Sequence, residues 1–494
     1  MEIKLIQRLF LVLLLFAALP VSGQISFYKV FAGNGYDRGE GACQLPDSSY
    51  LVTGSSSSFE EAPSQAFLMH IDSNGTFLWS HAYGGTESEE GKRVMAVPDF
   101  GYYIAGTSSS SGSEDFDNYL IFTDTGGNKL WEVFTDNGGW ERIHDAELLA
   151  DTSVFTVGET DSNATSNPDI FLVRYDKLGN VIWSKQYGSD QEDIAYACEI
   201  ASDTSVLVGG TYYVADSLQN KAYLAMIHIE DGSVIWEKTY GVEGNYRFND
   251  FTLLSGDIKA VGERIKTGKT DHDVFNVIAH MDGVLTGTEE HYEGDDARYT
   301  ACVQYQPGNF GKLFITTQRI DLAIPSSTYP EGEDVLINRH DSGLYWNFYG
   351  SGYSGVGQDQ VNQMIRTSDG FAFVVGYHTT YGPGGNSVML VKIGDDNYFP
   401  PATTNPPIYD IVNVEELTAL KSLQVYPNPV GNELQIKLDG EAFSFVLVDA
   451  TGKQVFSGEA FAHQSLDFAQ QSSGIYYLNI RHASGEATTV KIVR

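Results

Sequence analysis

A short phrase recurs along the chain at an almost constant spacing. Residues 175–188 read YDKLGNVIWSKQYG, and close variants occupy residues 71–85 and 229–241. Trp79, Trp131 and Trp183 are spaced 52 residues apart, and Trp236 follows 53 residues later. A repeat of about 50 residues without a helical pattern is typical of a propeller or a solenoid.

Each copy of the repeat predicts four short strands. In residues 91–134 they are GKRVMAVPD, FGYYIAGTS, DNYLIFTD and KLWEVFT. The turn before the fourth strand is rich in Asn and Gly, which tolerate positive φ angles. Seven copies fit between about residues 25 and 396, one of them with an insertion at 319–334. We therefore predict an all-β chain with a seven-bladed β-propeller at residues 24–396. Glycines share one register at the end of the second predicted strand: Gly54, Gly106, Gly158, Gly210, Gly262 and Gly376.

The two ends of the repeat region favour a closed ring. The region opens with a fourth-strand sequence, ISFYKVF at 25–31, and it closes with only three strands, the last at 387–395. The N-terminal strand is therefore expected to complete the last blade. In such a ring the recurring Trp and Tyr side chains should pack between blades, although each Trp could instead be a ligand platform.

The composition limits the partners of this chain. It carries 65 acidic and 30 basic residues, a net charge of −35, which excludes nucleic acid and anionic membranes as natural partners. So many carboxylates permit weakly bound calcium, but no metal ligands can be singled out, and no other cofactor is expected. The cysteines Cys43, Cys198 and Cys302 fall on first strands of non-adjacent copies, so three free thiols are expected.

The N-terminus has the pattern of an export signal. Lys4 and Arg8 precede an apolar run of 11 residues at 9–19, and small residues follow at 20–23. This pattern predicts a signal peptide over residues 1–23, because the run is too short to span a bilayer. We expect an exported monomer that is not a transmembrane protein.

The repeats resemble the secreted propeller repeats common in Bacteroidota. The segments that carry the likeness include PDFGYYIAGT, SDGFAFVVGY and RYDKLGNVIWSKQYG, and it covers about residues 25–396. The resemblance implies the propeller architecture and gives no indication of a ligand.

The last residues, 423–494, resemble the C-terminal sorting domain of type IX secretion. They read LQVYPNPVGNELQIKL, then FVLVDATGKQVFSG, SSGIYYLNI and finally VKIVR. The resemblance implies a small β-sandwich that interacts with the type IX machinery and directs passage through the outer membrane. It also implies frequent removal of the domain, which leaves the cargo secreted or anchored to the outer surface. The matching residues are Tyr426, Pro427, Asn428, Pro429, Asp449, Gly452, Lys453, Gly474, Tyr476 and Lys491.

Residues 397–422 separate the two predicted domains. This segment contains four prolines, which favour an extended and semi-rigid linker. We expect processing of the chain within it.

Arginines and aromatic residues recur in the loops that usually form the binding face of a propeller. Together they suit a sugar or an anionic glycan, through stacking and bidentate hydrogen bonds. The alternative is that the arginines pair with acids of neighbouring blades and stabilise the ring. The candidate residues are Tyr36, Arg38, Trp140, Arg142, Tyr246, Arg247, Arg298 and Tyr299.

No catalytic residues are assigned. The chain lacks G-x-S-x-G and H-E-x-x-H motifs, and its repetition is more regular than is usual around an active site. The favoured hypothesis is a non-catalytic cell-surface or secreted binding protein for a glycan or another extracellular macromolecule. The alternatives are a secreted carbohydrate-active enzyme, either a glycoside hydrolase or a polysaccharide lyase, and a structural adhesion protein.

Overall fold

The computed structural model describes residues 26–494 with gaps. The gaps are 60–61, 113–114, 163–166, 255, 292–295, 306–312, 322–332, 341–350, 354–357, 380, 395–407, 413–423, 427–429, 450–452, 473 and 483–486. Regular structure in the described residues is β-strand throughout, which confirms the predicted all-β class. The chain forms two compact units, Met1–Val412 and Asn413–Arg494. The described residues hold no helix that is long and apolar enough for a membrane span. The predicted signal peptide lies outside the described residues.

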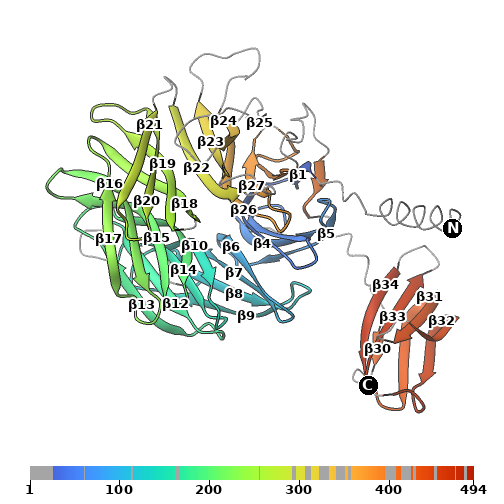
Figure 1. Cartoon of the computed structure of the whole chain (residues 1–494). Helices are drawn as coiled ribbons and strands as arrows, with labels where there is room; N and C mark the ends of the chain where they lie inside the picture. Colours follow the sequence, from blue (N-terminus) through green and yellow to red (C-terminus); the bar gives the residue numbers. More distant parts are fainter. Residues whose placement is uncertain are drawn as a thin grey trace, which may run out of the picture. The chain divides into compact units, whose positions relative to one another are not determined.

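The first unit consists of consecutive antiparallel sheets, called blades below and numbered along the chain (Figure 1). Blade 1 consists of β2 (Asp37–Gln44), β3 (Tyr50–Ser56), β4 (Gln65–Ile71) and β5 (Phe77–Tyr83). Blade 2 consists of β6 (Glu89–Val97), β7 (Gly101–Ser108), β8 (Asp117–Thr123) and β9 (Lys129–Thr135). Blade 3 consists of β10 (Glu141–Leu148), β11 (Val154–Thr160), β12 (Asp169–Tyr175) and β13 (Val181–Tyr187). Blade 4 consists of β14 (Ile194–Ser202), β15 (Ser205–Val214), β16 (Gln219–His228) and β17 (Val234–Tyr240). Blade 5 consists of β18 (Asn245–Leu254), β19 (Asp257–Ile265), β20 (His272–His280) and β21 (Leu285–His291). Blade 6 consists of β22 (Asp296–Tyr305), β23 (Leu313–Asp321), β24 (Glu333–His340) and β25 (Ser351–Tyr353).

Blade 7 combines the two ends of this unit. It contains β26 (Asp359–Arg366), β27 (Ala372–His378) and β28 (Ser387–Lys392), and the N-terminal strand β1 (Phe27–Ala32) pairs antiparallel with β28. The first strand of each blade contacts the first strands of both neighbours, including β2 with β26, so these strands form a closed circle. Figure 1 shows them innermost. Stretches of blade 6 lie outside the described residues, so the count of seven complete blades stays a prediction.

The recurring phrase links one blade to the next. Gly127, Gly179, Gly232 and Gly283 occupy the turn before the fourth strand at φ angles of 73–84°. At each of them an added Cβ would lie 2.7–2.9 Å from the Trp ring of the preceding blade, and at Gly75 it would meet the Phe27 ring of β1 at 2.8 Å. The Tyr of the phrase donates to the same turn, as Tyr83 does to the Gly127 carbonyl at 2.6 Å. These residues therefore pack between blades, as predicted.

A further strand covers the outer edge of β1. Strand β29 (Ile408–Asp410) pairs with β1 in parallel, and the Ile411 amide donates to the Ala32 carbonyl at 3.2 Å. Ile411 is fully buried, and its carbonyl accepts from Ser80 Oγ of blade 1 at 2.8 Å. The N-terminal strand thus lies between β28 and β29. The proline-rich composition of 397–422 gave no indication of this strand.

The second unit is built from five strands: β30 (Gln424–Tyr426), β31 (Glu433–Asp449), β32 (Gln454–Asp467), β33 (Ile475–His482) and β34 (Ala487–Val493). Strand β31 pairs with β30 and β32 in its first half and with β32 and β33 in its second. Its pairing with β32 is interrupted between Lys437 and Ala442. Side chains of both halves, such as Leu434 and Phe445, share one apolar core. The strands form a single hydrogen-bonded sheet, and the predicted sandwich of two sheets stays a prediction.

Candidate functional site

Seven polar side chains line one end of the central channel. Each innermost strand contains a β-bulge, in which one residue is left without a partner on the second strand. The bulge residues are Glu40, Lys92, His144, Tyr196, Asn249, Thr300 and Asn362. All seven line a single cavity of about 210 Å³, called the channel mouth below.

The register glycines account for the bulge in six of the seven innermost strands, while in blade 6 the bulge lies opposite Thr317 and Gln318. The Gly158 backbone faces the bulge of blade 3, where a Cβ would lie 1.8 Å from the Arg142 carbonyl oxygen. The same conflict, at 1.8–2.0 Å, occurs at Gly54, Gly106, Gly210, Gly262 and Gly376. A side chain there would displace the carbonyl that precedes the bulge. Glycine on the second strand therefore permits the bulge that turns a polar residue of the first strand toward the channel.

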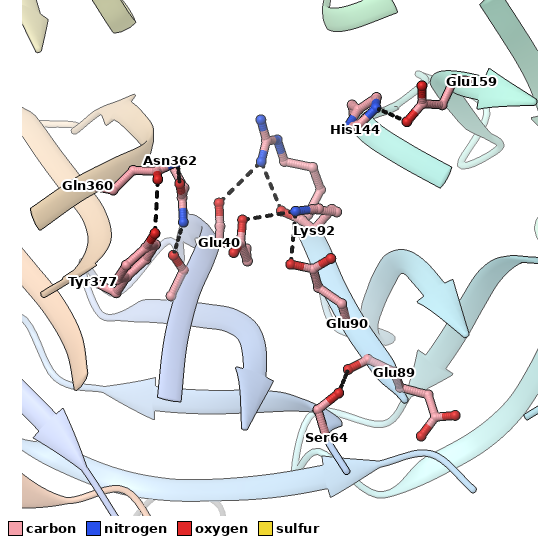
Figure 2. A network of polar contacts seen from close by, with 12 residues as sticks. Glu40, Ser64, Glu89, Glu90, Lys92, His144, Glu159, Gln360, Asn362 and Tyr377 are labelled. Atoms are coloured by element: carbon pink, nitrogen blue, oxygen red, sulfur yellow. Dashed lines mark hydrogen bonds and ion pairs between the residues drawn. The ribbon is translucent and has the colours of Figure 1, made fainter. Parts of the chain in front are cut away.

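A network of charges joins the first blades at this level (Figure 2). Lys92 Nζ donates to Glu40 Oε2 at 3.1 Å and to Glu90 Oε1 at 2.9 Å. Burial acts to lower the pKa of Lys92, but the two carboxylates outweigh it and raise that pKa. Burial raises the pKa of Glu40 to about 7 despite the ammonium. His144 Nε2 contacts Glu159 Oε1 at 3.1 Å.

Neutral polar groups complete the mouth on the side of blade 7. Tyr377 donates to Gln360 Oε1 at 3.0 Å, and Gln360 Nε2 donates to Asn362 Oδ1 at 2.8 Å. Asn362 Nδ2 in turn donates to the Gly39 carbonyl of blade 1 at 2.9 Å. The mouth therefore presents cations on one side and amides on another, an arrangement that can bind hydroxyl and carboxylate groups.

A second cavity, of about 340 Å³, continues the channel and is acidic; we call it the acid chamber. Asp145, Glu147, Glu199 and Asp250 line it. Burial raises the pKa values of Glu147 and Asp250 to about 8 and that of Glu199 to about 7. Arg93 lines both cavities, and its Nε lies 2.5 Å from Asp145 Oδ1.

Most of these acids also hold neighbouring blades together. Asp145 accepts from the Cys198 amide and Asp250 from the Cys302 amide, both at 2.8 Å. Glu199 accepts from the Leu253 amide at 3.1 Å. Cys198 and Cys302 lie on innermost strands and, like Cys43, are free thiols, as predicted.

The structure brings together only part of the predicted ligand set. Arg247 and Arg298 line the channel mouth, where Glu263 Oε1 and Oε2 lie 2.8 and 3.7 Å from their Nε atoms. Burial acts to raise the pKa of Glu263, but His272 and both arginines outweigh it and lower that pKa. Because Glu263 belongs to blade 5 and Arg298 to blade 6, the alternative that these arginines stabilise the ring applies here as well.

The other predicted residues lie elsewhere. Arg38 and Arg142 are exposed outside the mouth and lie over the rings of Tyr377 and Trp140, at 4.9 and 5.2 Å. Tyr36 is 64% exposed. Tyr246 and Tyr299 are buried, because alternate residues of a strand point to opposite faces and their neighbours take the channel side.

The bulge residues themselves were not predicted. They comprise six residue types among seven positions, with only Asn occurring twice, so no motif marks them. A positional signal exists, because Glu40 lies 14 residues before Gly54, and Lys92, His144, Tyr196 and Asn362 precede their register glycines by the same distance.

Several loop acids are structural. Glu89 and Asp193 are buried and accept from the loop amides of Gly85 and Ser189.

One group of acids could hold a cation, because carboxylate oxygens of Asp117, Asp136 and Glu141 lie within 4.8 Å of one another. Burial raises the pKa of Glu141 to about 7. These three residues were not singled out from the sequence, and weak calcium binding by this chain stays a prediction.

Several of the sorting-motif residues that the structure describes lie at or next to strand ends of the second unit. Tyr426 ends β30, and Asp449 ends β31 opposite Tyr476. Tyr476 is buried and donates to the Ser472 carbonyl at 2.6 Å. Gly474 exchanges two backbone hydrogen bonds with Arg494, which fixes the chain end beside β33. Lys453 is exposed and Lys491 lies on β34, whereas Pro427, Asn428, Pro429 and Gly452 are outside the described residues.

Comparison with solved structures returns propellers at low identity. The WD40 domain of Pan2 from Neurospora crassa is 8% identical with a TM-score of 0.44, covering 73% of this chain and 90% of that one. The propeller domain of the Trilobed protease from Pyrococcus furiosus is 9% identical with a TM-score of 0.41, covering 80% and 99%. PorZ, a surface component of the type IX secretion system of Porphyromonas gingivalis, is 9% identical with a TM-score of 0.27, covering 92% and 81%. With identities and TM-scores this low, these similarities say nothing about the function of this chain.

The C-terminal residues give the specific match. No curated protein matches the chain. Residues 424–494 match the family model described as the secretion system C-terminal sorting domain. The chain therefore ends in a type IX secretion sorting domain, as its motifs predicted.

Proposed function

We propose that this chain is an exported binding protein whose seven-bladed propeller holds a polar extracellular ligand, such as a glycan, in the channel mouth without catalysis. The observation that carries the proposal is the ring of seven polar bulge residues around one cavity. Arg247 and Arg298 on its wall favour a ligand with carboxylate groups, which guanidinium groups bind in a bidentate manner.

The route to the ligand follows from the sorting domain. The signal peptide at 1–23 takes the chain across the inner membrane, and the β-sandwich at 423–494 engages the type IX machinery. Processing within the linker then leaves the propeller, residues 24–396 with the strand that follows it, as a monomer. It is either secreted or anchored to the outer surface.

A carbohydrate-active enzyme is the second candidate, and the acid chamber favours it. Carboxyl groups with pKa values of about 7 to 8 can act as general acids at neutral pH. Against it, Asp145, Asp250 and Glu199 already accept backbone amides of the next blade. A structural adhesion role would require neither cavity.

The test is a glycan array on the full chain with parallel assays for new reducing ends. We expect an acidic oligosaccharide to be retained without cleavage, and the double variant Arg247→Gln, Arg298→Gln to weaken its binding at least 10-fold. The isosteric variant Thr300→Val removes one hydroxyl from the mouth and should weaken binding by the folded chain about threefold. Arg142→Gln, outside the mouth, is the control. Product release would overturn the binding assignment, and loss of retention in Arg142→Gln alone would return the site to the exposed loops.

A further inference from the structure

Blade 4 departs from the repeat at one hairpin. In blade 3 the pairing of the second and third strands ends at Thr160 and Asp169. In blade 4 the matching pair is Tyr212 and Lys221, and two more pairs follow before the turn. The hairpin of β15 and β16 is therefore longer than its counterpart in blade 3.

The extension exchanges small hydroxyl side chains for aromatic ones. Tyr212 occupies the register position of Ser56, Ser108 and Thr160, each of which donates a hydroxyl hydrogen bond to a buried acid. In blade 4 the buried acid, Asp193, accepts from the Tyr213 backbone amide at 2.6 Å instead. The Tyr212 side chain is thereby released from that structural role.

The rings of this hairpin line a groove of about 430 Å³ with polar groups from β17. Tyr212 stacks on Tyr223 at 5.1 Å between centroids, with 24° between planes. Tyr223 donates to Glu237 Oε2 at 2.9 Å, and Glu237, Lys238 and Asp216 are exposed along the same groove. Tyr212 and Tyr213 are half-buried, and both residues line the groove.

We propose that this groove is a second binding site, independent of the channel mouth, and that it takes a neutral saccharide. Aromatic rings that stack on the apolar face of a pyranose, beside carboxylate and hydroxyl acceptors for its hydroxyl groups, are the usual elements of a sugar site. The volume lies within the range of small-ligand sites. In the groove, Asp216 and Glu237 outnumber Lys238, so this site would repel an acidic sugar.

The experiment measures the affinity of the full chain for neutral hexasaccharides of glucose, mannose and xylose, with a galacturonate hexasaccharide as the acidic probe. The variant Tyr212→Thr, Tyr213→Ser gives blade 4 residue types found at these positions in blades 1 to 3, so the fold should be kept. We expect the affinity for a neutral probe to fall at least 10-fold. Leu218→Ser, at the exposed tip of the same hairpin, is the control and should have no effect.

The channel-mouth variant Arg247→Gln, Arg298→Gln separates the two proposals, because it should leave binding of the neutral probe unchanged. The groove proposal is overturned if the parent chain retains no neutral probe. It is also overturned if the tyrosine variant binds within twofold of the parent, or if only the channel-mouth variant loses the neutral sugar.

Discussion

The outer rim and the inner ring of the propeller use the same repeat in opposite ways. On the rim, Trp79, Trp131, Trp183 and Trp236 repeat one contact, a ring packed on the turn glycine of the next blade. On the inner ring, the seven bulge residues share a position but comprise six residue types. Repetition of residue type therefore marks structure in this chain, whereas a repeated position with varied residue types marks the candidate site.

The largest expected effect comes from removing β1, the N-terminal strand that completes blade 7 and closes the ring. Deletion of residues 24–32 removes β1, including Phe27 on Gly75 and the fully buried Phe31. Blade 7 then loses its strand between β28 and β29, and we expect no cooperative unfolding transition. All six tryptophans precede residue 413, so their fluorescence reports the first unit alone.

The matched control for this deletion removes only residues 24–26, which precede β1. It should melt like the parent chain. A cooperative melt of the 24–32 deletion at the parental temperature would show that β1 does not close the ring.

A glycine substitution tests whether the inner ring depends on its bulges. Gly158→Ala places a Cβ about 1.8 Å from the Arg142 carbonyl, which forces the bulge to shift. We expect a loss of about 3 kcal/mol in the free energy of unfolding by urea, in the upper range for overpacking. Gly126→Ala, where the nearest atoms are side-chain tips at 3.3 Å, should cost less than about 0.5 kcal/mol. Equal losses at the two glycines would contradict this explanation of the bulge.

One pair of variants separates the rim from the ring directly. Trp131→Ala removes a half-buried ring from Gly179 and should cost about 2 kcal/mol of stability, with ligand retention unchanged. Thr300→Val in the channel mouth should cost about 1 kcal/mol of stability, the net value of one hydrogen bond, and weaken retention. If Trp131→Ala abolished binding in the folded chain, the rim could not be purely structural.

The acid chamber predicts a smaller effect of pH on stability. The folded pKa of Glu147 is raised from 4.5 to about 8, so the folded chain binds this proton more tightly than the unfolded chain. The stabilisation is complete below pH 4.5 and is lost as the pH rises toward 8. The full shift would give Glu147→Gln a gain of about 3.5 kcal/mol relative to the parent between pH 5 and pH 8. Because Glu147 is only half-buried, solvent screening should reduce this gain to about 2 kcal/mol, measured by urea unfolding at each pH. Parallel pH profiles of the two proteins would show that Glu147 is not buried in the folded chain.

The sequence was sufficient for everything that rests on local pattern. Strand periodicity and turn glycines predicted the order of strands within each blade, and the unpaired N-terminal strand predicted the pairing of β1 with β28. The bulges were not predicted, because a bulge depends on the register between two strands, and the constant spacing to the register glycines has this meaning only once that register is known. Strand β29 was missed because its contacts with Ala32 and Ser80 are distant in sequence. Tyr246 and Tyr299 were assigned to the ligand because spacing alone does not say which face of a strand points to the channel.

The most direct test of the inner ring is a structure of the full chain with the acidic oligosaccharide that the array retains. We expect the sugar in the channel mouth, with its carboxylate within hydrogen-bonding distance of Arg247 or Arg298 and its hydroxyl groups beside Asn362 or Thr300. A sugar bound instead on the exposed loops around Arg38 and Arg142, with the channel mouth unchanged, would contradict this expectation.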